Sequence, residues 1–171
     1  MADRAASQTV GQAPDWLTEP ELRSWRTLID VTTGVLATLD NELRAEHGLS
    51  LGEYEVLARL SEEPDHSLRM TDLASRLRLS PSGITRRIDG LVRAGLVERR
   101  QCPSDRRGSN AVLTPEGLHR LRDAAPAHVR GVRAHFIDQL SAQQLANLAA
   151  ALSSVDVDGA SAAGGCDESV G

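Results

Sequence analysis

Cysteine, lysine and aromatic residues are scarce or missing in this chain. Only two cysteines, Cys102 and Cys166, occur among its 171 residues, too few for a disulfide scaffold or a four-ligand zinc site. We therefore expect free thiols, and neither a metal ion nor another cofactor. Aromatic residues account for 2% of the chain, and every one of its nineteen basic residues is arginine. A GC-biased coding sequence is the simplest explanation for the missing lysine.

Long hydrophobic runs and catalytic motifs are missing too. No apolar run approaches the roughly 18 residues that span a bilayer, and the first 15 residues hold no hydrophobic signal core. This pattern predicts a cytoplasmic protein without a membrane segment. The sequence also lacks the glycine-rich nucleotide-binding loops, the zinc-protease motif and the nucleophile elbow of common enzyme classes. We therefore expect no enzymatic activity.

Positive charge is concentrated in the centre of an acidic chain. The net charge of −5 by itself argues against nucleic-acid binding. Between Arg69 and Arg107, however, the chain has ten arginines and four acidic residues, a net charge of +6, so the remainder carries −11. A basic segment within an acidic protein is typical of one face that meets phosphates while the rest of the protein stays soluble.

Apolar residues at helical spacing flank this basic segment. A stripe through residues 19–48 predicts one long helix, and two more amphipathic helices are predicted within residues 114–155. The intervening residues 49–113 are expected to form a compact lobe, in which Ser50 and Thr71 cap two short helices.

The two ends of the chain carry no such pattern. Residues 1–18 lack sustained periodicity, and residues 156–171 are rich in Gly, Ala, Ser and Asp. We expect a flexible N-terminal arm and a disordered C-terminal tail.

The clearest local signal is a helix predicted over residues 80–94. Ser80 followed by Pro81 is an N-cap with proline at the first helical position, and Gly95 ends the helix. At 100° per residue, Ile84, Ile88 and Leu91 share one side, while small and basic side chains face the other. The slim first turns suit a major groove, where Arg, Ser and Thr donate to base edges. The outward and flanking residues are Ser82, Gly83, Thr85, Arg86, Arg87, Asp89, Gly90 and Arg93.

A β-hairpin is predicted to follow over residues 97–113. Its strands flank a loop at residues 102–108, in which Pro, Ser, Asp and Gly supply turn chemistry. The adjacent Arg106 and Arg107 are poorly explained by turning alone and suit phosphate or minor-groove contact. Other arginines nearby are interpreted as phosphate contacts or salt-bridge partners rather than base readers: Arg93, Arg99 and Arg100.

This order of elements resembles the MarR (multiple antibiotic resistance regulator) winged helix-turn-helix family over roughly residues 20–155. The most specific stretches are LASRLRLSPSGITRRIDGLVRAGLVER from Leu73 and DRRGSNAVLTPEG from Asp105. The resemblance implies a mainly α fold with a small β-hairpin wing, in which a winged lobe joins a helical dimerisation region. It also implies a homodimer that binds a pseudo-palindromic operator on double-stranded DNA, most commonly as a repressor. In the wing, Arg107 would enter the minor groove and Asp105 would orient it.

The candidate DNA-binding residues are therefore Ser80, Ser82, Gly83, Thr85, Arg86, Arg87, Arg93, Arg99, Asp105, Arg106 and Arg107. For the arginines on the helix, a merely solvated face is the alternative. The dimer has its own physical reason, since three amphipathic helices outside a compact lobe would expose apolar stripes on a monomer. The alternative is that these helices pack only on their own lobe.

Members of this family commonly release DNA when a small, often aromatic or phenolic anion enters a pocket between the dimer helices and the lobe. Trp25 and Tyr54 are candidate wall residues, and Arg26 is a candidate partner for a carboxylate. Ordinary core packing of the two aromatic residues is the alternative. Oxidation of Cys102, at the base of the wing among arginines that favour a thiolate, is a second candidate trigger. The peroxide-sensing branch of the family, however, places its cysteine near the start of the first helix, where this chain has none.

Two other functions are weighed against DNA binding. A winged helix attached to a methyltransferase would need a longer chain. A protein-binding winged helix would carry acidic or apolar residues where this sequence has arginines.

Overall fold

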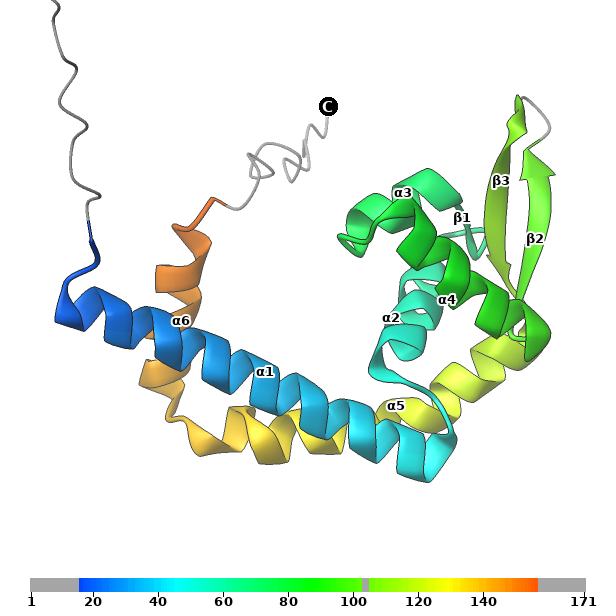
Figure 1. The fold of residues 1–171 in the computed structure, drawn as a ribbon. Helices are drawn as coiled ribbons and strands as arrows, with labels where there is room; N and C mark the ends of the chain where they lie inside the picture. The colour runs from blue at the N-terminus through cyan, green and yellow to red at the C-terminus, as the bar shows by residue number, and fades with distance from the viewer. Residues whose placement is uncertain (1–15, 103–104, 157–171) are drawn as a thin grey trace, which may run out of the picture. The chain divides into compact units, whose positions relative to one another are not determined.

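The computed structural model describes residues 16–102 and 105–156, and for residues 102 and 105–107 it describes the backbone alone. Residues 157–171 of the predicted disordered tail and residues 1–15 of the predicted arm lie outside the described residues. The described chain contains six α-helices, one short 3₁₀ helix and three strands (Figure 1). The mainly α fold with a small hairpin is thereby confirmed. In chain order the elements are α1 (Glu19–His47), α2 (Leu51–Ser61), β1 (Ser67–Arg69), α3 (Met70–Arg76), α4 (Pro81–Arg93), β2 (Val97–Cys102), β3 (Asp105–Leu113), α5 (Pro115–His135), η1 (Ile137–Gln139) and α6 (Ala142–Ser153).

The chain forms two compact units, Met1–Gly34 and Val35–Gly171. In the first unit, α1 begins where the amide and hydroxyl of Thr18 donate to a carboxylate oxygen of Glu21 at 2.6 and 2.7 Å. The predicted start of this helix is therefore confirmed. Its large apolar side chains are exposed rather than buried: Trp25, Leu28, Ile29 and Val31.

The second unit has one hydrophobic core, which the last turns of α1 share with the lobe. Leu43 of α1 and Leu57 of α2 are almost completely buried, as are Ile84, Ile88 and Leu91 of α4. The predicted inward side of the helix over residues 80–94 is thus confirmed. Because these three side chains fix one face of α4 in the core, the opposite face is turned to solvent.

The three strands form an antiparallel sheet in the order β1-β3-β2. The predicted loop over residues 102–108 is wrong, since β2 runs to Cys102 and β3 already begins at Asp105. A register shift between Gln101 and Cys102 accommodates this longer ladder. Continued strand pairing satisfies backbone groups that an open loop of seven residues would leave to water.

The predicted cap of α3 is also wrong. The helix begins at Met70, after Arg69 in extended conformation, and no side chain caps it. The hydroxyl of Thr71 instead donates to the neighbouring Asp72 carboxylate at 3.2 Å. The helix starts early because β1 ends at Arg69 and its backbone turns directly into the first helical turn.

The last two long helices differ in how they pack. α5 is capped by Thr114, whose hydroxyl accepts the Gly117 amide at 2.9 Å, and Leu121 and Ala124 on its inner face are buried. α6 begins with the predicted capping box of Ser141 and Gln144, yet it buries no residue within this chain.

Candidate nucleic-acid interface

The N-terminus of α4 is held in a fixed geometry by its own sequence. The Ser80 hydroxyl accepts the Gly83 amide at 3.1 Å, and it lies 3.2 Å from the Ser82 hydroxyl. Pro81 occupies the first turn, where its missing N–H costs nothing. A rigid cap of this kind presents the first turns of α4 in one orientation.

Two small residues and one arginine dominate the outward side of these turns. Ser82, Thr85 and Arg86 are exposed. No described residue makes a hydrogen bond or ion pair with the Arg86 guanidinium. Its charge and its donors are therefore available to a partner outside the chain.

Arg99, predicted as a phosphate contact or a salt-bridge partner, has the second role in this structure. From β2 its guanidinium reaches α4, where it lies 3.0 Å from an Asp89 carboxylate oxygen and donates to the Thr85 carbonyl at 3.2 Å. These contacts tie the base of the hairpin to the helix beside it (Figure 1). Sequence reasoning missed Asp89 as the partner, because no local spacing connects a helix residue to a strand ten positions later.

Of the other predicted arginines, Arg93 and Arg100 also make contacts within the chain. Arg93 is exposed and donates through Nε to the Asp89 carbonyl at 3.2 Å. Arg100 forms an exposed ion pair with Glu98 at 2.9 Å on the same strand. Arg87 is half-buried on the flank of α4 that faces α2, rather than on the outward face.

Three wing residues complete the predicted interface: Asp105, Arg106 and Arg107. Their backbones lie in β3, but their side chains lie outside the described residues. The same holds for the side chain of Cys102, so its predicted redox role stays a prediction.

The candidate effector residues are divided between the two units of the chain. Tyr54 packs against His128, with ring centroids 4.5 Å apart. Burial raises the pKa of the Tyr54 hydroxyl and lowers that of the His128 imidazole. Trp25 and Arg26 belong to the other unit, where Trp25 is 55% exposed.

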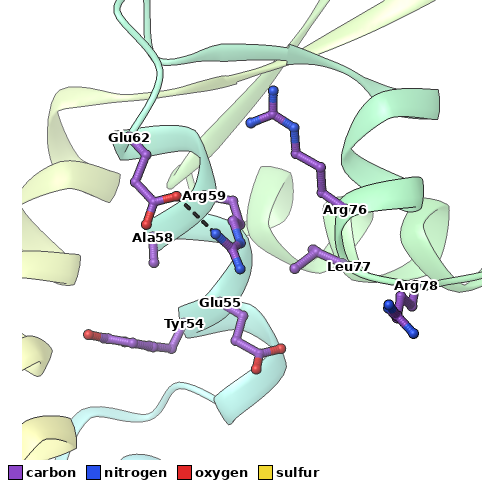
Figure 2. A pocket seen from close by; sticks show the side chains of 8 residues that line it. All are labelled: Tyr54, Glu55, Ala58, Arg59, Glu62, Arg76, Leu77 and Arg78. Atoms are coloured by element: carbon purple, nitrogen blue, oxygen red, sulfur yellow. Dashed lines mark hydrogen bonds and ion pairs between the residues drawn. The ribbon is translucent and has the colours of Figure 1, made fainter. Parts of the chain in front are cut away.

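Tyr54 also borders an open cavity of about 310 Å³ that sequence reasoning did not foresee (Figure 2). Residues of α2 form one side, and the end of α3 with the following turn forms the other. Three arginines line it, of which Arg59 pairs with Glu62 at 3.1 Å and Arg76 pairs with Glu63. The lining residues are Tyr54, Glu55, Ala58, Arg59, Glu62, Arg76, Leu77 and Arg78.

Two further classes of site are absent from residues 16–102 and 105–156. No group of three or more His, Cys, Asp or Glu side chains is placed to hold a metal ion. None of the described helices combines the length and apolar character needed to cross a membrane.

Known proteins share this architecture. A model of the MarR family matches residues 49–109. AbsC, a MarR family transcriptional regulator from Streptomyces coelicolor, is 42% identical; the match covers 81% of this chain and 93% of that one, with a TM-score of 0.76. The chain belongs to the MarR family. A second MarR family regulator from the same organism, solved in complex with DNA, is 37% identical over 82% of this chain and 88% of that one, with a TM-score of 0.78.

Curated relatives of this MarR family chain are transcriptional regulators as well. The repressor YetL of Bacillus subtilis is 39% identical over 53% of this chain and 54% of its own length. The regulator PapX of Escherichia coli is 35% identical over 46% of this chain and 48% of its own length. The chain therefore spans about half the length of these two relatives. Family membership explains the winged helix-turn-helix lobe, in which α3 and α4 are the two helices of the motif.

Proposed function

We propose that this chain is a cytoplasmic, homodimeric repressor that binds a pseudo-palindromic operator through α4 and the β2–β3 wing and is released by a small anion. The observation that carries the proposal is the outward face of α4. Ser82, Thr85 and Arg86 are exposed there, while three apolar side chains hold the opposite face in the core. A slim, basic helix fixed on its back fits a major groove and is poorly suited to an acidic or apolar protein partner.

Within this proposal the residues have different tasks. Ser82, Thr85 and Arg86 read bases, while Ser80 and Gly83 set the helix start from which they project. Arg93 contacts phosphate from the last turn of α4. In the wing, Arg106 contacts phosphate, and Arg107 enters the minor groove with Asp105 as its orienter. Support for the DNA partner comes from the relative solved in complex with DNA.

A salt-titrated mobility-shift assay tests this function. The protein is titrated against the DNA upstream of its own gene and against random duplex of equal length. We expect tighter binding to the first and a steep fall of affinity with salt for both. Equal affinity for the two DNAs would reduce the chain to a non-specific binder, and binding to neither would refute the proposal.

A pair of charge variants assigns the contact to α4. Arg86→Ala should weaken operator binding and reduce the slope of log K against log salt by about 1. Arg122→Ala on α5 removes the same charge from another exposed position and should leave both quantities unchanged. Equal effects of the two variants would mean that net charge, rather than the α4 face, carries the binding.

The proposed dimer is formed by α1, α5 and α6, with residues 49–113 as the DNA-binding lobe. It is supported by apolar side chains that this chain leaves exposed, among them Trp25 at 55%, Val129 at 54% and Leu152 at 46%. Full burial of each such side chain against a partner would contribute about 1.5–3 kcal/mol. Light scattering on a sizing column should therefore give twice the chain mass. A clean monomer at micromolar concentration would refute this part of the proposal.

For the effector, we propose an aromatic or phenolic carboxylate that enters the cavity beside Tyr54 (Figure 2). Arg59 and Arg76 lie in exposed ion pairs, so a ligand carboxylate can replace their glutamate partners at little cost. The alternative is a site on the first helix, in which Arg26 pairs with the ligand carboxylate and Trp25 forms a wall of the pocket. Calorimetric titration with salicylate should show binding that Arg76→Ala weakens and Arg26→Ala does not. If Arg26→Ala weakened binding and Arg76→Ala did not, the site would lie on the first helix. If neither the unaltered protein nor the variants bound salicylate, the effector would be removed from the proposal.

A further inference from the structure

Arg87 follows Arg86 in sequence but points in a different direction. It leaves α4 on the flank that faces α2 and is half-buried there. Its guanidinium occupies the space in front of Gly52, in the first turn of α2. A Cβ atom on Gly52 would lie 2.5 Å from Arg87 Cζ and 2.7 Å from each of its two Nη atoms. The side chain can lie in this place because residue 52 has none.

A carboxylate close to Arg87 belongs to Asp40 of α1. Asp40 of α1 accepts the Leu51 amide at 2.8 Å through Oδ1 and Arg44 Nε at 2.7 Å through Oδ2. These bonds, together with the nearby charges of Arg44 and Arg87, hold the pKa of the Asp40 carboxyl below its usual range. Asp40 thus connects the last turns of α1, the start of α2 and the flank of α4.

In a second contact between the same two helices, the glycine belongs to α4 and the charged side chain belongs to α2. Glu53 of α2 lies in front of Gly90 of α4, where a Cβ atom would be 3.5 Å from Glu53 Oε1. The other oxygen of Glu53 accepts the amide and the hydroxyl of Ser50 at 2.9 and 2.6 Å, so this side chain is fixed. Each helix therefore offers a glycine to a charged side chain of the other, and the two charges have opposite sign.

We infer that Arg87 is a positioning residue, which fixes the recognition helix against α2 and the end of α1 through its seat on Gly52, and that it does not contact DNA. This inference rests on the proposed function and differs from the prediction that Arg87 lies in the interface. The two adjacent arginines then have separate tasks. Arg86 contacts DNA, and Arg87 sets the angle at which α4 presents Arg86.

The test is a double-mutant cycle with Arg87→Ala, Gly52→Ala and the combined variant. A methyl group on Gly52 meets the far end of a flexible side chain, so it should displace the guanidinium rather than disrupt α2. Each single variant should lower operator affinity by roughly fivefold, the size expected for one partly exposed charged contact. The combined variant should bind no more weakly than either single variant, because each change removes the same contact.

The salt dependence separates positioning from phosphate contact. Arg87→Ala should leave the slope of log K against log salt unchanged, whereas Arg86→Ala should reduce it by about 1. A reduced slope for Arg87→Ala would show that Arg87 contacts phosphate, and additive losses in the cycle would show that Gly52 does not seat it. Either result overturns the inference.

The unaltered protein and the three variants of this cycle are also compared by thermal unfolding in the absence of DNA. Non-additive changes of Tm would support the seat of Arg87 on Gly52, and additive changes would refute it. If the unaltered protein bound no DNA, the proposed function would fail, and this second measurement would still decide whether Arg87 and Gly52 are coupled.

Discussion

The first turn of α5 is packed so closely on the lobe that one methyl group should disturb it. The Thr114 amide donates to the Leu96 carbonyl at 3.1 Å, and its hydroxyl donates to the Gly95 carbonyl at 2.8 Å. Gly117 lies one turn further along and is buried. A Cβ atom there would overlap the Leu96 carbonyl oxygen and lie 2.8 Å from Leu113 Cδ1. Since the main obstacle is backbone, no side-chain rotation can relieve it.

Gly117→Ala should therefore destabilise the fold. Overpacking costs about 1–3 kcal/mol, and loss of the Thr114 to Leu96 hydrogen bond adds about 1 kcal/mol. The better helix propensity of alanine offsets about 1 kcal/mol. The net loss of unfolding free energy is about 1–3 kcal/mol. In a chain of this size this corresponds to a Tm lower by roughly 2–4 °C for each kcal/mol.

Urea denaturation followed by circular dichroism measures this loss. Gly90→Ala is the matched control, because it is also a helical glycine, yet its new methyl group meets Glu53 at an ordinary 3.5 Å. This control should be as stable as the unaltered protein or slightly more so. If Gly117→Ala matched the control, α5 would not be docked on the Leu96 carbonyl, and the reasoning would be wrong. The variant should also weaken operator binding, since Leu96 lies between α4 and β2.

Three further perturbations test the lobe. Ser80→Ala removes the N-cap of α4 and should cost about 1 kcal/mol in urea denaturation, while Ser80→Thr retains most of it; equal losses would argue against the cap. Leu57→Ala leaves a cavity at a fully buried position and should cost about 2–5 kcal/mol; a loss under 1 kcal/mol would contradict the core described here. Burial lowers the pKa of His128 below its ordinary 6.5, so near pH 6 the unfolded chain binds more protons than the folded one. Unfolding free energy should therefore fall as the pH drops through 6.5, and His128→Gln should make that fall shallower; an unchanged pH profile would refute this.

Features that depend on neighbours in sequence were predictable. The capping of α4 by Ser80 and of α6 by Ser141 involves partners three residues away, so the sequence displays both members of each interaction. The inward side of α4 was predictable for a similar reason, because a helix repeats its faces at a fixed spacing. The order of helices and the position of the hairpin followed from these local signals.

Features that depend on tertiary contacts were not predictable. Thr71 has the side chain of a cap, but the helix start is decided by where β1 ends. The residues CPSDRRG have the composition of a loop, but pairing with the partner strand extends both strands into them. The helical wheel places Arg87 on a flank of α4, but the glycine that makes room for its guanidinium lies 35 positions earlier, in another helix. In each case the deciding interaction involves another element of the fold, whereas the prediction used only residues close in sequence.

The same limit applies to the charge count that first indicated DNA binding. Of the ten arginines between Arg69 and Arg107, three form ion pairs with acidic residues and Arg87 is turned toward α2. Arg69 and Arg78 also have interaction partners. The proposed DNA contacts of each lobe are then at most four arginines: Arg86, Arg93, Arg106 and Arg107. At a slope of about −0.9 per neutralised phosphate, ten contacts would give about −9 per lobe, and four give about −4 at most. The measured slope of log K against log salt should thus be less than half of what composition suggests, and this ratio is the same for one lobe as for two. A slope near the full value would mean that the ion pairs open on binding, with Asp89 released from Arg99 as the first change to look for.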